Sequence, residues 1–271
     1  MRKLSFLVLC LISISFSQTF LMHDVPESSP MFQLKFQKPH FDTKEEFTFY
    51  TGTYDLFLNM PLTSKYNIEA NIPYAIGQLK DNDDDAIDNF GNIYLGLQSR
   101  ISKNANKTSI LSLGVNLPTT SDNMKDISAT FISILTNPTK MIKYYPNTFG
   151  LYTNYAKHIK NNNGSVFGFE LGPEVFVPTG DNDNDVELLA HYGLKAGLNV
   201  RKVTLFSELV GVVYLSEDFN EFGDRFLETV SIGGQWNGRN FKPGINIKRN
   251  LDDEITRTTD WILGFNFNYI F

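Results

Sequence analysis

Apolar and polar residues alternate along most of this chain with a period of two. Residues 260–271 show the pattern most clearly. Their alternate positions form two sets, Trp261, Leu263, Phe265, Phe267, Tyr269 and Phe271 against Ile262, Gly264, Asn266, Asn268 and Ile270. Successive side chains of a β-strand point to opposite faces, so this pattern predicts a strand with one aromatic face and one more polar face.

Segments with this alternation recur at a length that lets a tilted strand cross a bilayer, about nine to eleven residues. An aromatic face of this kind would promote aggregation on a soluble edge strand, whereas in a closed barrel it faces lipid. The sequence therefore predicts an all-β fold, a transmembrane antiparallel β-barrel of about 12 strands. The predicted strands are 31–38, 46–60, 65–75, 91–102, 107–117, 146–157, 165–178, 187–200, 202–215, 226–236, 240–248 and 260–271.

The last strand resembles the closing strand of bacterial outer-membrane β-barrels, which ends on an aromatic residue. Phe267, Tyr269 and Phe271 carry this resemblance. It implies that these three residues form the assembly signal and that the barrel assembly machinery is a partner.

The N-terminal residues have the pattern of a secretory signal. Arg2 and Lys3 are basic, residues 4–14 are almost wholly apolar, and Ser15 and Ser17 are small residues where a signal peptidase cleaves. The apolar run is shorter than the roughly 18 residues that a membrane-spanning helix needs. We therefore expect a signal peptide at 1–17 and a single barrel domain at 18–271. No cysteine remains after cleavage, which excludes disulfides.

The predicted strands are joined alternately by short turns and long segments, as in outer-membrane barrels with short periplasmic turns and long extracellular loops. Basic residues concentrate at the short turns and acidic residues at the long loops. The net charge of −6, or −8 without Arg2 and Lys3, argues against a nucleic-acid partner. The bilayer and lipopolysaccharide are the expected surroundings. The longest loop, 118–145, contains a predicted short helix at 124–135, and it either folds inward as a constriction or caps the surface.

Two acidic loops have the alternating aspartates that can converge on calcium. The predicted oxygen donors are Asp81, Asp83 and Asp85 in one loop, and Asp181, Asp183 and Asp185 in the other. Neither loop completes an EF-hand, because Ala86 and Val186 stand where glycine is required. We expect no cofactor, with a divalent cation at these loops as the alternative to solvated carboxylates.

Several charged residues alternate with the apolar face and are predicted to point into the barrel. They either line a water-filled pore or pair across a closed interior, since a 12-stranded barrel lies between small filled barrels and wide porins. The lumen-lining candidates are Glu69, Arg100, Glu170, Glu174, His191, Lys195, Glu208, Lys242 and Lys248.

Catalytic residues are not predicted. A barrel lipase or deacylase needs a histidine paired with a serine nucleophile, and neither His158 nor His191 stands in a His-x-Ser-Asn-Gly setting. A barrel protease would use carboxylates and a histidine at the loop rim, and the loop acids leave that class open. We predict that the protein is not an enzyme.

Three segments together resemble the outer-membrane transporters named for the meta-pathway of phenol degradation. They are Ile72-Pro73-Tyr74, the stretch 91–97 and the stretch 113–119, with an echo at 177–181. The chain departs from the family where it has Gly91-Asn92 and Pro118-Thr119-Thr120. The resemblance implies a transport role, for aromatic or other hydrophobic molecules, and brings no catalytic residues.

These observations predict an outer-membrane channel or transporter of a Gram-negative bacterium that passes small solutes by diffusion. The alternative is a closed barrel with a structural or interaction role, which presents its acidic loops to a partner or to surface lipid.

Overall fold

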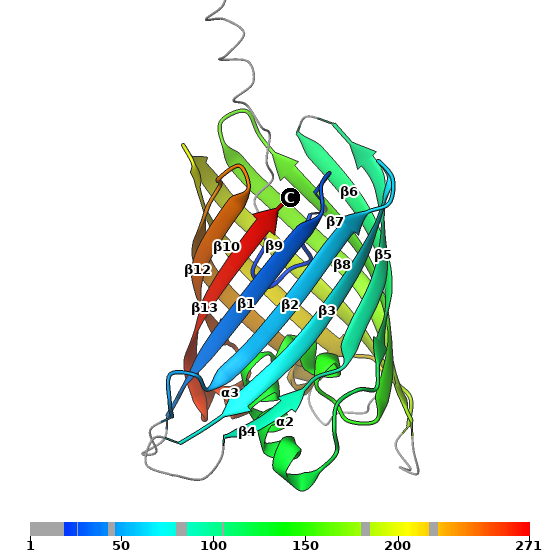
Figure 1. Ribbon diagram of the computed structural model, residues 1–271, viewed down its shortest axis with the longest axis vertical. Coiled ribbons are helices and arrows are strands. Elements are labelled where there is room, and N and C mark those ends of the chain that lie inside the picture. Colours follow the sequence, from blue (N-terminus) through cyan, green and yellow to red (C-terminus); the bar gives the residue numbers. More distant parts are fainter. Residues whose placement is uncertain are drawn as a thin grey trace, which may run out of the picture.

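Twelve strands form a closed barrel in the part of the chain that the structure describes, and Figure 1 shows their steep tilt around the wall. The structure is a computed structural model that describes residues 19–25, 27–42, 47–79, 86–104, 106–179, 185–216 and 222–271. The predicted signal peptide at 1–17 lies outside these residues. The wall strands are β1 (Met31–Phe41), β2 (Gly52–Pro61), β3 (Tyr66–Gly77), β5 (Ile93–Lys103), β6 (Lys107–Leu117), β7 (Thr148–Lys160), β8 (Ser165–Pro178), β9 (Glu187–Val200), β10 (Val203–Tyr214), β11 (Phe226–Trp236), β12 (Phe241–Asn250) and β13 (Thr259–Ile270).

Every strand pairs antiparallel with its neighbours, and the barrel closes where β1 meets β13. The register there runs from Met31 opposite Ile270 to His40 opposite Trp261. A further short strand, β4 (Ile87–Phe90), pairs with the end of β3. β5 takes over the pairing with β3 only from Tyr94 opposite Asn71. The predicted strands correspond to the twelve wall strands, whereas β4 falls in a segment predicted as loop.

The period-two pattern divides the side chains between the two faces of the wall. On β13, Trp261, Phe267 and Tyr269 are exposed outside the barrel, and Asn266 and Asn268 are buried inside. The same division holds on β3, where Tyr66 and Ile68 are exposed and Glu69 is fully buried. An apolar outer face around a polar interior is the arrangement expected of a barrel surrounded by lipid.

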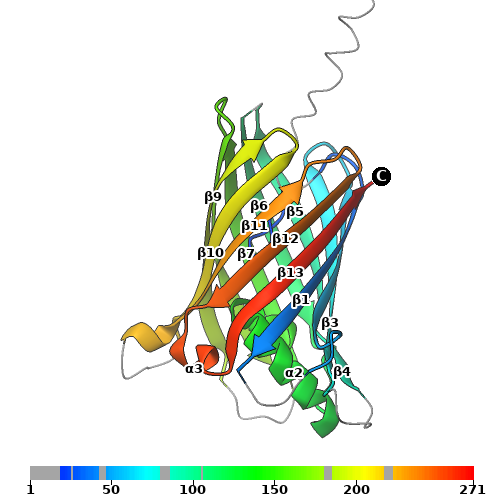
Figure 2. The same ribbon diagram turned by 90° about the vertical axis from the view of Figure 1, so that its left-hand side faces the viewer.

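The two ends of the barrel differ. Short connections gather at the end where the chain terminates, the shortest being Arg201-Lys202, with Arg201 in the left-handed region at φ 56°. The opposite end carries β4, the helix α2 (Met124–Thr136), the 3-10 helices η1 (Pro138–Lys143) and η2 (Phe222–Arg225), and α3 (Asp253–Thr256). Figure 2 shows α2 and α3 together at that end. No helix among the described residues is long and apolar enough to cross a membrane.

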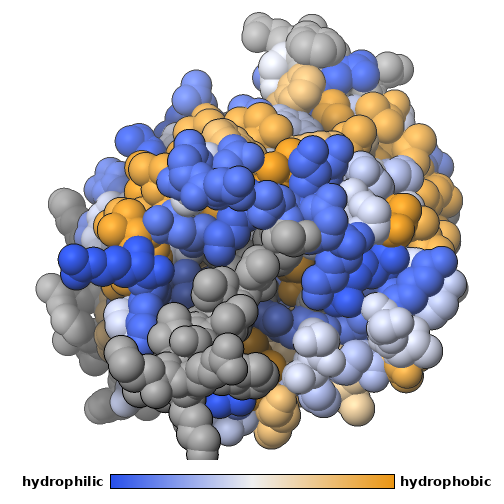
Figure 3. All heavy atoms as spheres, turned by 90° about the horizontal axis from the view of Figure 1, so that it is seen from above, coloured by the Kyte–Doolittle hydropathy of each residue, from blue (hydrophilic) through white to orange (hydrophobic). Residues whose placement is uncertain are grey.

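The end face with the short connections is polar towards its middle. Figure 3 views it end-on, with hydrophilic residues across much of the centre and hydrophobic residues in an arc along the outer edge. The polar surface therefore coincides with the barrel end, and the apolar surface with its side wall.

Candidate functional site: a polar lumen with two inserted segments

The interior of the barrel carries the charged side chains predicted to face the lumen. Arg100 is half-buried near the short turns, where its Nη1 donates to the carbonyl of Ser64 at 3.0 Å. The other eight are buried by nine-tenths or more. They are Glu69, Glu170, Glu174, His191, Lys195, Glu208, Lys242 and Lys248.

Most of these charges have partners inside the barrel. Glu174 Oε1 lies 3.0 Å from His191 Nδ1, and Lys195 Nζ lies 3.7 Å from Glu208 Oε1 in the opposite register position on the next strand. Lys242 Nζ lies 2.5 Å from Glu27 Oε1. Burial of a charge is costly without such compensation, so the pairs make a charged interior compatible with folding.

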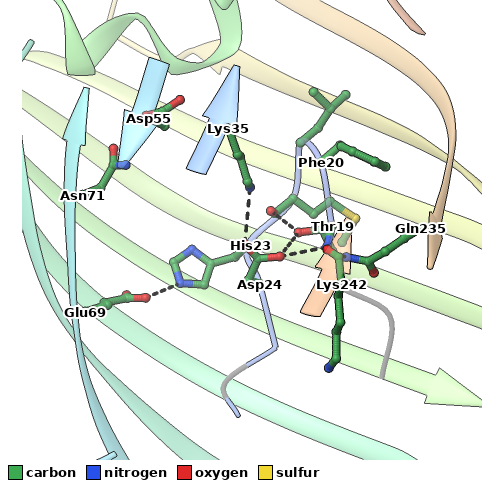
Figure 4. A network of polar contacts seen from close by, with 12 residues as sticks. Thr19, Phe20, His23, Asp24, Lys35, Asp55, Glu69, Asn71, Gln235 and Lys242 are labelled. Atoms are coloured by element: carbon green, nitrogen blue, oxygen red, sulfur yellow. Dashed lines mark hydrogen bonds and ion pairs between the residues drawn. The ribbon is translucent and has the colours of Figure 1, made fainter. Parts of the chain in front are cut away.

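Residues 19–25 lie inside the barrel, a placement that the sequence analysis did not predict. Phe20, Leu21 and Met22 pack against Phe206 and Val210 of β10 in a buried cluster. The rings of Phe20 and Phe206 stack with their centroids 5.1 Å apart. Figure 4 shows the segment threading between the strands that supply its polar partners. We call residues 19–25 the N-terminal insert.

Carboxylates of three wall strands hold the backbone and side chains of the N-terminal insert. Glu208 accepts hydrogen bonds from the backbone N–H groups of Phe20, at 3.0 Å, and Leu21, at 2.8 Å. Glu170 accepts from the His23 N–H at 2.8 Å, and Glu69 Oε2 lies 3.0 Å from His23 Nε2. Hydrogen bonds to a charged group are stronger than neutral ones, so these acids anchor the insert firmly.

Neighbouring side chains shift the pKa values of the two ionisable residues of the insert, His23 and Asp24. Burial lowers the pKa of His23, but the adjacent carboxylate of Glu69 outweighs it, and the net pKa is raised. Burial raises the pKa of Asp24, but Lys35 at 3.3 Å and the hydrogen bonds from Thr19 reverse the direction, and the net pKa is lowered. Both side chains therefore favour their charged forms in the lumen.

The loop at 118–145 folds inward, which decides between the two alternatives left by its sequence. The predicted helix forms as α2, and Ile142 of η1 is buried against the inward-facing Phe176, Leu189 and Val212. Helix α2 also packs against β2, β3 and β4. We call residues 137–143, which follow α2 and lie across this end of the lumen, the loop insert.

Polar bonds tie the loop insert to the wall. Asn137 donates to Thr53 Oγ1 at 3.1 Å and accepts from Lys248 Nζ. Lys143 Nζ lies 2.9 Å from Asp55 Oδ1. Burial is the largest influence on Lys143 and lowers its pKa, with Asp55 acting in the opposite direction. The sequence pattern predicts the loop but none of these contacts.

A cavity of ≈120 Å³ separates the two inserts, and we call it the chamber. The N-terminal insert supplies one side of it, the loop insert supplies another, and wall strands complete it. Figure 4 shows Lys35, Asp55 and Asn71 on strands facing the insert. The lining residues are Phe20, Leu21, Met22, His23, Asp24, Gln33, Lys35, Gln37, Asp55, Phe57, Asn71, Tyr94, Asn116, Asn137, Thr139, Lys140, Ile142, Lys143, Tyr152 and Glu174.

The predicted cation-binding loops fall mostly outside the described residues. This applies to Asp81, Asp83, Asp85, Asp181 and Asp183. Asp185 is described and exposed. Within the described part of the chain, no group of three or more histidine, cysteine or acidic side chains is arranged to hold a metal ion.

The fold is similar to that of several solved outer-membrane barrels. The COG4313 outer membrane channel from Pseudomonas putida F1 matches with a TM-score of 0.61 and 11% identity, over 95% of this chain and 100% of that one. This chain has the fold of an outer-membrane β-barrel. The KdgM porin matches with a TM-score of 0.50 and 7% identity, over 88% of this chain and 99% of that one.

The NanC porin also has a TM-score of 0.50 and 7% identity, over 89% of this chain and 98% of its own length. No family model matches the sequence, and no curated protein matches it either. At these identities the similarity shows the fold alone. The function depends on the side chains inside this barrel.

Proposed function

We propose that this protein is a passive channel for small solutes in the outer membrane of a Gram-negative bacterium, closed in the state described here by its two inserts. The observation that carries the proposal is that the lumen is lined by charged and amide side chains of the wall and filled by segments outside the wall strands. The twelve strands close without those segments, because every pair in the ring is joined strand to strand. Displacing the inserts would leave a polar passage inside an intact wall.

The fold comparisons support this proposal, since the solved barrels described above include a channel and two porins. The aromatic or otherwise hydrophobic solute that the resemblance to the phenol-pathway transporters implies stays a prediction. So does the assignment of the short turns to the periplasm and of the acidic loops to the outside.

The surroundings of His23 and His191 favour transport over catalysis. His191 lies 3.0 Å from Asn154 Oδ1 and 3.0 Å from Glu174, and its ring stacks on Tyr152. His23 contacts Glu69. Among the described residues these histidines meet amides, carboxylates and rings, whereas nucleophilic hydrolysis needs a histidine against a hydroxyl or thiol.

Planar-bilayer conductance tests the proposal with four forms of the protein: the wild type, a deletion of residues 19–25, a deletion of residues 121–143 and both deletions combined. Both deletions are expected to raise the unit conductance or open fraction, and their combination to raise it most. Silence of all forms, with insertion verified, would favour the alternative of a closed interaction barrel.

A crosslinked variant supplies the matched control. A Cβ at position 193 would lie 2.9 Å from Cγ of Met22 and 2.8 Å from Cγ of Glu170, so Met22→Cys with Gly193→Cys places two cysteines side by side if the flexible Glu170 side chain shifts by a few tenths of an ångström. The oxidised form should stay closed, and reduction of the same sample should restore wild-type behaviour.

A further inference from the structure

Two lysines face outward on the barrel wall near the short connections. Lys107, the first residue of β6, is exposed, and Lys157 on β7 is half-buried. Lys157 stands opposite Ser109 and Lys107 stands opposite Ile159, so the two lysines are diagonal neighbours on one face of the wall. Diagonal neighbours of an antiparallel pair lie roughly 7–8 Å apart. Both flexible side chains can therefore reach a common anion.

The positive charge of these lysines is not balanced by nearby acids. Among the described residues, neither ammonium group makes a hydrogen bond or an ion pair. The residues around the three adjoining turns, 101–109, 157–169 and 194–207, include no aspartate or glutamate. In this half of the described wall strands, the other outward-facing positions are uncharged. The partner that this pair lacks is an anion from outside the chain.

The depth of Lys157 in the wall indicates which anion is within reach. Lys157 lies three residues before the end of β7, about 10 Å along the strand. Exposed aromatic residues occupy the same zone of the wall, among them Phe167, Trp236 and Phe241. Aromatic girdles mark the interface of an outer-membrane barrel with the lipid headgroups, and a lysine in a girdle extends its amine towards them. The anion is therefore a lipid phosphate.

A groove of ≈440 Å³ lies beside Lys157 and spans the outer wall from β7 to β10. Small residues form its floor, since Ala196 on β9 stands opposite Ser207 on β10. Ser207 Oγ donates to the carbonyl of Ser231 at 2.9 Å, so this hydroxyl is satisfied within the wall. The shape and apolar lining of the groove suit an acyl chain. Larger apolar side chains border the floor: Phe167, Phe169, Leu194 and Leu209.

We propose that this groove is a binding site for an anionic glycerophospholipid of the leaflet at the short-connection end, with its phosphate between Lys107 and Lys157 and one acyl chain in the groove. Selection depends on the headgroup, because lipid tails are as apolar as the side chains they contact and the groove adds packing alone. One lysine near anionic lipid favours association about fivefold. The site lies on the outside of the wall, so it is independent of the proposed channel function.

Quenching of a single tryptophan by dibrominated lipid tests the site in vesicles. The full mature chain carries Phe169→Trp, opposite Lys157, together with Trp236→Phe and Trp261→Phe. The vesicles are phosphatidylcholine with a small fraction of dibrominated phosphatidylglycerol, and dibrominated phosphatidylcholine is the zwitterionic reference. We expect phosphatidylglycerol to be enriched at least about fivefold over phosphatidylcholine beside this probe.

The matched probe is Phe32→Trp in the same background. It lies at an outward position of β1, on the opposite side of the barrel from β8. Enrichment of phosphatidylglycerol there should stay below about twofold, because no outward lysine is near. Equal enrichment at the two probes would overturn the proposal.

Charge substitutions locate the headgroup. Lys107→Gln and Lys157→Gln should each lower the enrichment beside the Phe169→Trp probe severalfold, and the double variant should abolish it. The control is Lys65→Gln, which removes a lysine of the same barrel end, 5.4 Å from the ring of Tyr66 on an exposed turn. An equal loss in Lys65→Gln would show a general attraction to the basic rim and refute a defined site.

A filled groove tests the placement of the acyl chain. Ala196→Phe would occupy the floor and leave both lysines in place, so quenching by dibrominated phosphatidylglycerol should fall. Ala190→Phe, at an outward position of β9 nearer the α2 end, should leave it unchanged. Unchanged quenching in Ala196→Phe would overturn the placement of the chain in the groove. Displacement of phosphatidylglycerol by lipopolysaccharide would overturn the assignment to a glycerophospholipid.

Discussion

His23 Nε2 lies 3.0 Å from Glu69 Oε2, a contact that joins the N-terminal insert to the middle of β3 across 46 positions of sequence. The same carboxylate accepts a hydrogen bond from the Tyr94 hydroxyl at 2.8 Å. Glu69 therefore links the wall to the insert through one oxygen and to the neighbouring strand through the other.

The attachment of the N-terminal insert should weaken as pH rises. Glu69 raises the pKa of His23 above its usual 6.5. The stabilisation by protonated His23 is then fully present below the unfolded pKa and is lost as pH rises through the folded value. Open fraction in planar bilayers should increase from pH 5 to pH 9, and His23→Gln should flatten this dependence. His40→Gln, at a half-exposed histidine near Asp260, should retain it.

Glu208→Gln should loosen the insert at its other attachment. The substitution replaces the charged acceptor of the Phe20 and Leu21 N–H groups by a neutral one, and it also removes the carboxylate paired with Lys195, so thermal unfolding of the variant is measured in parallel. Loss of about 1.5 kcal/mol of charged hydrogen bonding would raise the open-to-closed ratio roughly tenfold. Channel recordings measure this ratio directly. The control is Glu228→Gln, which changes the partner of the Tyr192 hydroxyl. This substitution should leave the open-to-closed ratio unaltered.

The pair of Lys143 and Asp55 should stabilise the loop insert. The two side chains are 23% and 8% exposed, so screening by solvent limits the contribution of the pair to about 1–2 kcal/mol. Asp55→Asn and Lys143→Met should each make residues 121–143 more susceptible to limited proteolysis. The double variant should be less affected than the sum of the single variants. Additive effects would show that the two charges act separately.

Phe271→Ala should impair assembly into the outer membrane if the terminal aromatic residues are the assembly signal. Phe271 is 69% exposed and its ring meets Tyr269 edge-on at 5.0 Å, so its removal costs the folded barrel little packing. The expected result is less heat-modifiable folded protein in membranes, with unchanged refolding in detergent. Phe131→Ala on α2, at a residue 57% exposed, is the matched control. A refolding defect in vitro would assign the residue to stability instead.

The strand pattern was readable from sequence because a barrel wall has chemically different faces. The predicted bounds of 165–178 and 187–200 coincide with β8 and β9. The inward positions of Glu170, Glu174 and His191 follow from the same alternation. β4 escaped prediction because its four residues, Ile87-Asp88-Asn89-Phe90, are too short to establish a period.

The inserts were less accessible to sequence reasoning. Phe20, Leu21 and Met22 come shortly after the predicted signal peptide at 1–17, so their hydrophobicity carried no separate information. Their placement depends on Phe206, Val210 and Glu208, nearly 190 positions away, and no local pattern reports such a contact. The helical segment of the loop was predicted, but its inward fold depends on contacts with distant strands.

The barrel closes by pairing β1 with β13, and this pairing bears on the order of folding. Because these strands stand at opposite ends of the sequence, their pairing is the longest-range event of folding and completes the wall. The N-terminal insert ends five residues before β1, so its entry into the lumen is coupled to the position of that strand. A bulky group attached at residue 19 is therefore expected to hinder seating of the insert in the lumen, whereas one placed in a loop at the α2 end should not.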